Sequence, residues 1–180
     1  MGSVIILYLS NSALSVLLFF AGACSPCVVA APQTEPAPAA PTLEQHRAHI
    51  ETMLQQWEDE WVKNDGSRPN DQRFSLAAEA YVAGIDDLSM LEALFYDLHS
   101  IDPWEHHLQA WSDGLEFFFY YIVRDIAKRG TKEAYDVFIR IKQYSCDGAW
   151  AGTLRSLEWK YFRQYSQDPR VLESKNGVFH

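Results

Sequence analysis

Residues 104–126, WEHHLQAWSDGLEFFFYYIVRDI, carry the longest helical pattern in this chain of 180 residues. Apolar side chains recur there at steps of three or four residues, the spacing that places them on one face of an α-helix. They are Trp104, Leu108, Trp111, Leu115, Phe118, Phe119, Ile122 and Ile126. A second apolar stripe follows the opposite side: Ala110, Gly114, Phe117 and Tyr121. A helix that is apolar on two sides lies at the centre of a domain or shows one side to a partner. We expect a central helix, with a partner-facing stripe as the alternative.

The same spacing recurs in five other stretches: 43–61, 74–85, 88–98, 135–144 and 150–165. Turn-forming residues separate them: Asp65-Gly66 with Pro69, Asp102-Pro103, Gly130, Asp147-Gly148 and Asp168-Pro169, the last of which closes the sixth helix. Thr131 with Glu133, and Ser89 with Glu92, supply capping-type residues near helix starts. The sequence therefore predicts an all-α domain over residues 42–180, with about six amphipathic helices in a compact bundle or a short helical-hairpin array.

The N-terminal segment has a different composition, with no Asp, Glu, Lys or Arg before Glu35. Residues 4–20 are mostly apolar and are followed by the small residues of Ala21-Gly22-Ala23-Cys24, an order typical of an export signal. This stretch resembles the lipobox of bacterial lipoproteins, although Ala21 stands where that family usually has Leu. The resemblance, which covers residues 1–24, implies cleavage before Cys24 and acylation of its thiol. Cleavage after Ala23, Ala30 or Ala31 would instead release a soluble periplasmic protein, and the uncleaved apolar run would be a membrane anchor.

Residues 24–41 contain five of the eight prolines and read as a semi-rigid tether between lipid and domain. Ser25 is compatible, in the lipoprotein family, with sorting to the outer membrane. We therefore expect an envelope protein that faces the periplasm. If Cys24 is acylated, Cys27 and Cys146 remain as a possible disulfide in an oxidising compartment.

Few residue patterns point to catalysis or metal binding. The sequence has no HExxH, GxSxG, P-loop or dinucleotide-binding motif, and we expect no cofactor. His46 with His49, and His106 with His107, are candidate metal ligands, but surface or capping roles are commoner and we predict no metal site. The acids Glu58-Asp59-Glu60 and Asp86-Asp87 are candidate carboxylate pairs for a glycan-cleaving enzyme. Because such acids usually cap helices or face solvent, we predict no catalytic residue.

The charge distribution is uneven. Residues 74–123 contain nine acids and no Lys or Arg, whereas residues 124–180 contain eleven basic residues and seven acids. A net charge of −9 makes nucleic acid an unfavourable partner. Two explanations stay open: the basic C-terminal helices pair with the acids, or the acids form a face that steers a cationic protein. The second explanation gives a predicted partner-binding set: Asp86, Asp87, Glu92, Asp97, Asp102 and Glu105.

These features together favour a non-enzymatic, protein-binding lipoprotein of the bacterial envelope, whose membrane contact is its N-terminal lipid. Residues 80–87, AYVAGIDD, resemble a segment of periplasmic immunity proteins. That resemblance implies masking of a toxin in the periplasm through the acidic face. The alternatives are an envelope scaffold or assembly lipoprotein, and a glycan- or peptidoglycan-active enzyme with paired carboxylates.

Overall fold

The protein is all-α, as the apolar periodicity predicts. The computed structural model describes residues 40–145 and 150–175, and these ranges contain helices and no strand. The elements are α1 (Leu43–Lys63), α2 (Gln72–Ala83), α3 (Leu88–Leu98), the 3-10 helix η1 (Pro103–Glu105), α4 (Leu108–Lys128), α5 (Lys132–Tyr144), α6 (Trp150–Phe162) and α7 (Pro169–Glu173). The predicted signal, the tether up to residue 39, the acylation site Cys24 and the Cys27–Cys146 pair lie outside the described residues.

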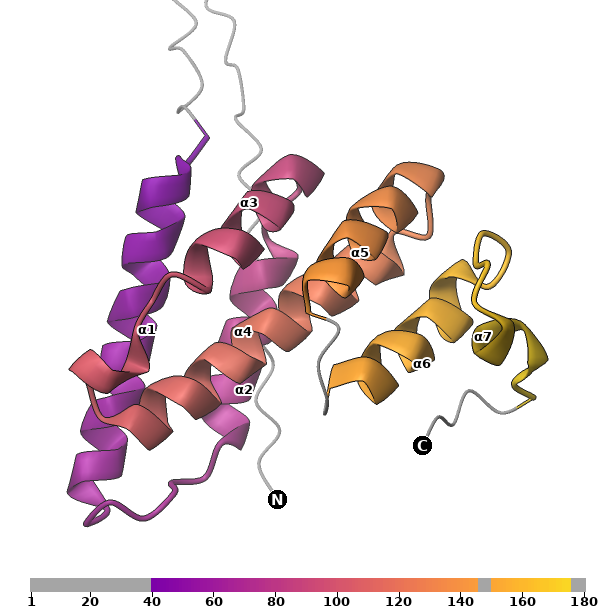
Figure 1. Cartoon of the computed structure of the whole chain (residues 1–180). Coiled ribbons are helices and arrows are strands. Elements are labelled where there is room, and N and C mark those ends of the chain that lie inside the picture. The colour runs from indigo at the N-terminus through magenta and orange to yellow at the C-terminus, as the bar shows by residue number, and fades with distance from the viewer. Residues whose placement is uncertain (1–39, 146–149, 176–180) are drawn as a thin grey trace, which may run out of the picture. The chain divides into compact units, whose positions relative to one another are not determined.

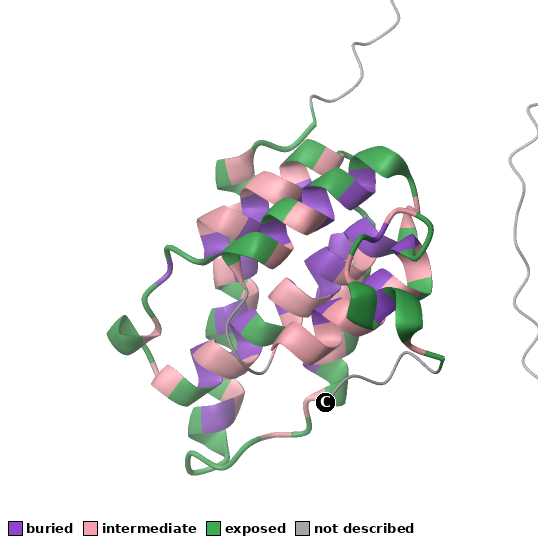
Figure 2. Ribbon diagram, turned by 45° about the vertical axis from the view of Figure 1, so that its right-hand side comes forward, coloured by how far each residue is buried: buried purple, intermediate pink, exposed green. Residues whose placement is uncertain are grey.

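α4 is the central helix. It packs against α1, α2, α3, α5, α6 and η1, and Figure 1 shows it running between the α1–α3 group and α5. Both of its apolar stripes are buried: Leu115 and Ile122 belong to one stripe, and Ala110 and Tyr121 to the other. In Figure 2 the buried positions face inward across the helices, while exposed positions lie on their outer sides.

Gly114 marks a close approach of α1 to α4. A Cβ added at this position would lie 2.4 Å from Leu54 Cδ2, 3.4 Å from Trp57 Cδ1 and 3.5 Å from Phe74 Cζ. Leu54 and Trp57 are fully buried, so the space beside Gly114 is filled by side chains of α1 and α2. Glycine is therefore the residue that lets these three helices meet at this distance.

The start of α4 differs from the prediction. Trp104 was expected at the head of the longest buried stripe, but it lies in η1 and 77% of its surface is exposed. The helix begins at Leu108 because the His107 side chain accepts a hydrogen bond from the Ala110 backbone amide and so caps α4. Pro103 suits the first position of a helical turn, and it starts η1 instead.

Two further helix starts also correct the prediction. Asp87, and not Ser89, caps α3, since its carboxylate accepts hydrogen bonds from the backbone amides of Ser89 and Met90. Asp168 and Pro169 do more than close the sixth helix: they start the short helix α7, with Asp168 as its cap. Thr131 caps α5, as expected. None of the helices in the described ranges is long and apolar enough to span a membrane.

Candidate functional site

The most exposed large apolar side chain among the described residues is Trp104. It stands on a turn of residues 102–106, which we name the Trp104 turn. Asp102 shapes this turn: its Oδ1 accepts a hydrogen bond from the Trp104 backbone amide at 2.9 Å, and its carbonyl accepts one from the Glu105 amide at 3.3 Å. The backbone beneath the exposed indole is therefore fixed by local hydrogen bonds.

Glu58 on α1 anchors the chain directly after this turn. Its Oε1 accepts a hydrogen bond from the His107 backbone amide at 3.0 Å, and its Oε2 accepts one from Trp111 Nε1 at 2.7 Å. The His106 ring stacks on the Trp111 indole, with 3.6 Å between ring centroids and 5° between planes. Trp111 is itself in the core. Because α1 and α4 hold the end of the turn at His106 and His107, and Asp102 forms hydrogen bonds at its start, Trp104 is an exposed aromatic residue on a turn that is held in place.

Two of the six predicted partner-binding acids pair within the domain. Glu92 on α3 accepts two hydrogen bonds from Arg140 on α5, at 2.6 and 2.7 Å. Asp97 forms an ion pair of 3.2 Å with Arg47 on α1. The first of the two explanations, pairing with the basic C-terminal helices, therefore holds for Glu92, whereas Asp97 pairs with a basic residue of α1.

The other four acids have local roles or none. Asp87 and Asp102 are helix caps, and the hydrogen bonds that Ser89 gives to Asp87 hold the pKa of this carboxyl below its usual value. The Asp86 carbonyl accepts a hydrogen bond from Arg129, while its side chain is exposed. Glu105 is exposed, and its carboxylate has no hydrogen bond or ion pair within residues 40–145 and 150–175. Asp102 and Glu105 thus flank Trp104 on the same turn.

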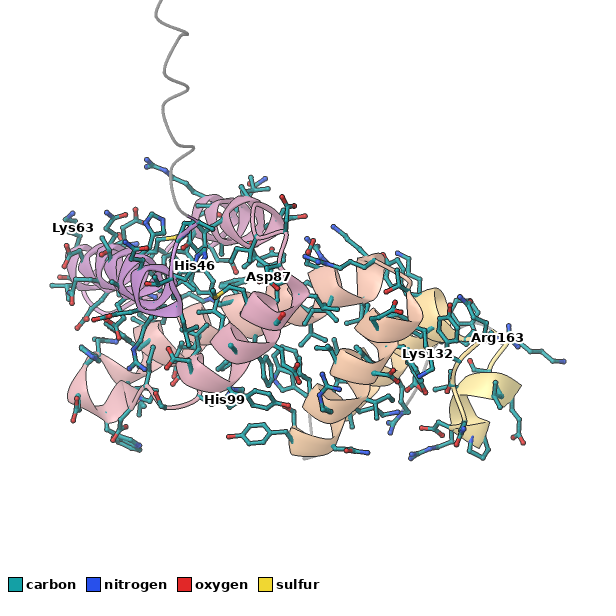
Figure 3. The ribbon with its side chains drawn as sticks, turned by 90° about the horizontal axis from the view of Figure 1, so that it is seen from above. His46, Lys63, Asp87, His99, Lys132 and Arg163 are labelled. Carbon is teal, nitrogen blue, oxygen red and sulfur yellow. The ribbon has the colours of Figure 1, made fainter. Side chains whose placement is uncertain are left out.

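The candidate histidine ligands are engaged separately. His46 Nδ1 is hydrogen-bonded to the Tyr81 hydroxyl at 2.8 Å, and the His49 ring stacks on Tyr81 at 4.4 Å. Figure 3 shows His46 at the contact between α1 and α2. Burial, followed by the neighbouring His49, lowers the pKa of His46. His106 and His107 serve the Trp104 turn and the α4 cap. In the described part of the chain, no three His, Cys, Asp or Glu side chains gather as metal ligands.

The candidate carboxylates of α1 face different neighbours. Glu58 points to the start of α4, whereas Glu60 lines a cavity of about 110 Å³ together with Arg73 of α2. Asp59 is exposed and accepts a hydrogen bond from Gln55. The structure therefore places Glu58 and Glu60 against different neighbours.

A buried charged cluster that the sequence analysis missed links α5, α6 and α7. Glu158 on α6 is 1% exposed. It accepts hydrogen bonds from Lys142, Ser166 and Tyr135, and Lys142 also pairs with Asp168 at 3.3 Å. Burial, with Glu158 as the next cause, raises the pKa of Tyr135 to about 12. The one available signal was a carboxylate beside Leu154 and Leu157 on an apolar stripe, because a buried acid needs partners.

This cluster lies beside a cavity of about 820 Å³. Figure 3 shows Lys132, which lines this cavity, on the side of the domain away from Lys63. Each cation on its wall already has an anion: Lys132 pairs with Asp136, Arg140 with Glu92, and Lys142 with Glu158. The cluster therefore links α5, α6 and α7. The cations that line the cavity are paired with anions of the same domain.

Comparison with known proteins gives no relative: the chain matches no protein-family model, no curated protein and no solved structure.

Proposed function

We propose that this chain is an exported, lipid-anchored protein-binding module, which docks a cationic partner on the Trp104 turn. The observation that carries the proposal is the 77% exposure of Trp104 on a turn that is hydrogen-bonded in place. Tryptophan is enriched among the few residues that dominate binding energy at protein interfaces. A rigid support lowers the entropic cost of binding, because the side chain is already positioned.

Charge favours a basic partner. Asp102 and Glu105 flank the indole, and the chain as a whole carries a net charge of −9. Opposite charge on a partner raises the association rate and disfavours wrong partners. The concrete form of the proposal is an immunity-type protein that masks a toxin in the periplasm. A toxin identified as the partner would support this form, and a cell-wall synthesis protein would favour an envelope scaffold.

The binding test compares variants in kinetics with the partner captured from envelope extracts. We expect Trp104→Ser to weaken binding about 30-fold or more, the effect of losing roughly 2 kcal/mol. The matched control is Leu76→Ser, since Leu76 is 58% exposed on α2 away from the turn, and we expect it to keep the affinity. Equal losses from both variants would contradict docking on the Trp104 turn.

The acids are tested in the same assay. Asp102→Asn with Glu105→Gln should slow association, most visibly at low salt, because the charges act over a Debye length of about 8–10 Å. Asn is also a good capping residue, so the turn is retained. Glu92→Gln with Asp97→Asn is the control, and we expect it to leave association unchanged because those acids are paired internally. Slower association of the Glu92→Gln, Asp97→Asn variant, with no change for the Asp102→Asn, Glu105→Gln variant, would place the binding face on α3.

Export and anchoring are tested by intact mass of the protein extracted from membranes. We expect a chain that begins at Cys24 and carries lipid. A lipid-free chain that begins at Ala31 or Pro32 would contradict the lipid anchor. Docking on the Trp104 turn would then be judged by the binding test alone.

A further inference from the structure

A groove of about 390 Å³ lies between α4 and the start of α6, and we name it the α4–α6 groove. Its aromatic lining comes from Phe117, Tyr120 and Tyr121 on α4 and from Trp150 on α6. Phe117 and Tyr120 are only half-buried, unlike Phe118 on the core side of the same helix. The second apolar stripe of α4 therefore faces the core at Gly114, and it lines the α4–α6 groove at Phe117 and Tyr121.

The rings are held by contacts with α2, with each other and with Arg124. Tyr121 is hydrogen-bonded to Ser75 on α2. The Phe117 and Tyr121 rings lie nearly parallel, with 6.5 Å between centroids and 14° between planes. A guanidinium already sits on this aromatic group, since Arg124 Cζ is 4.6 Å from the Tyr121 ring and 5.4 Å from the Tyr120 ring. Arg124 is in turn paired with Glu79. The rings are thus held in place, and aromatic faces attract cations.

The groove also carries carboxylates with one neutralising cation. Asp113 and Glu116 line it, and so does Arg68 from the α1–α2 connection. Arg68 pairs with Asp113 at 3.4 Å and with Asp71 at 3.1 Å, so this single cation serves two acids. Glu116 is exposed, and among the described residues its carboxylate has no ion pair or hydrogen bond. One unneutralised acid therefore remains next to the aromatic rings.

We propose that the α4–α6 groove binds the guanidinium group of an arginine side chain presented by a partner. Aromatic faces and a carboxylate together attract organic cations and disfavour anions. A guanidinium is planar, so it stacks on a ring and donates two parallel hydrogen bonds to a carboxylate, whereas an ammonium is a strongly hydrated point charge. The Arg124–Tyr121 contact already places a guanidinium group over a tyrosine ring in this protein.

The test is an NMR titration of the full-length, detergent-solubilised protein with the peptide Ac-Gly-Arg-Gly-NH₂. The six tryptophan indole N–H signals are observed, and Trp150→Phe identifies the signal of Trp150. We expect the Trp150 signal to move on titration, while that of Trp104 stays in place. The same peptide with citrulline, which is neutral and similar in shape, should bind about tenfold or more weakly, because the charged hydrogen bond is lost. Equal binding of the two peptides would overturn the proposal.

Variants locate the site without disturbing the fold. Glu116→Gln, at an exposed position, should weaken arginine-peptide binding several-fold, whereas Glu133→Gln, an exposed acid on α5, should not. Trp104→Ser should leave peptide binding unchanged, so a failure of this proposal is distinguishable from a failure of docking on the Trp104 turn. Choline is the second probe: tighter binding of choline than of the arginine peptide would assign the groove to a small quaternary ammonium compound and overturn the guanidinium assignment.

Discussion

Gly114→Ala should destabilise the protein, although alanine is the better helix former. The new Cβ would lie 2.4 Å from Leu54 Cδ2, and Leu54 is fully buried against Trp57, so its branch has no solvent to move into. Overpacking of this kind costs about 1–3 kcal/mol. The gain from replacing a mid-helix glycine offsets about 1 kcal/mol of that. We therefore expect a net loss of up to roughly 2 kcal/mol, and a fall in melting temperature of up to roughly 10 °C.

The assay is denaturant unfolding followed by circular dichroism. Gly84→Ala is the control, since its φ of −81° is ordinary and its Cβ would meet backbone oxygen at 3.4 Å, and we expect a change within about 0.5 kcal/mol. Leu54→Val removes the branch that clashes, so Gly114→Ala with Leu54→Val should cost less than the two single changes together. Stabilisation by Gly114→Ala, or strict additivity of the two changes, would refute a close contact between α1 and α4 at this residue.

Three other changes have expected outcomes in the same unfolding assay. Glu158→Gln should cost about 1–3 kcal/mol because it replaces a buried oxygen that accepts hydrogen bonds with an amide that donates them, whereas Glu92→Gln, which breaks an ion pair to a half-exposed arginine, should cost less than about 1 kcal/mol; equal costs would contradict the burial of Glu158. The folded-state pKa of His46 is lowered below its ordinary 6.5, so its contribution is present above that pH and is lost as the pH falls; the wild type should lose more stability than His46→Gln between about pH 7 and pH 5, and parallel pH curves would refute this. Leu115→Asp should cost several kcal/mol by burying an unpaired charge in α4, and an unchanged melting temperature would place Leu115 outside the core.

Helix periodicity predicts most of this fold because burial repeats with the helical turn. The stretch 43–61 was expected to bury one stripe of the first helix, and Ile50, Leu54, Trp57 and Trp61 are buried there. Both apolar stripes of the fourth helix were visible, and they correctly indicated a central element. Trp104 was misplaced because spacing alone does not show where a helix starts. The capping side chain of His107 decides that point, and histidine is an uncommon cap.

The polar contacts between helices could not be predicted from the sequence, for a physical reason. Arg47 and Asp97 are fifty residues apart, and Lys142 and Glu158 are sixteen apart on different helices. Which charges meet depends on the angles at which helices pack, and one sequence does not fix those angles. The choice between internal pairing and an exposed acidic face could therefore not be made from the charge distribution. In the structure the answer differs between residues. Glu92 and Asp97 are paired internally, whereas the Glu105 carboxylate has no partner within the described ranges.

The most direct test of docking on the Trp104 turn is site-specific photocrosslinking in intact cells. A photoreactive phenylalanine derivative replaces Trp104 in one strain and Leu172, another exposed apolar residue, in a second. We expect illumination to give one discrete protein adduct from position 104 and none from position 172, because crosslinking requires contact with the bound partner. No adduct from position 104, or the same adducts from both positions, would contradict docking through the Trp104 turn.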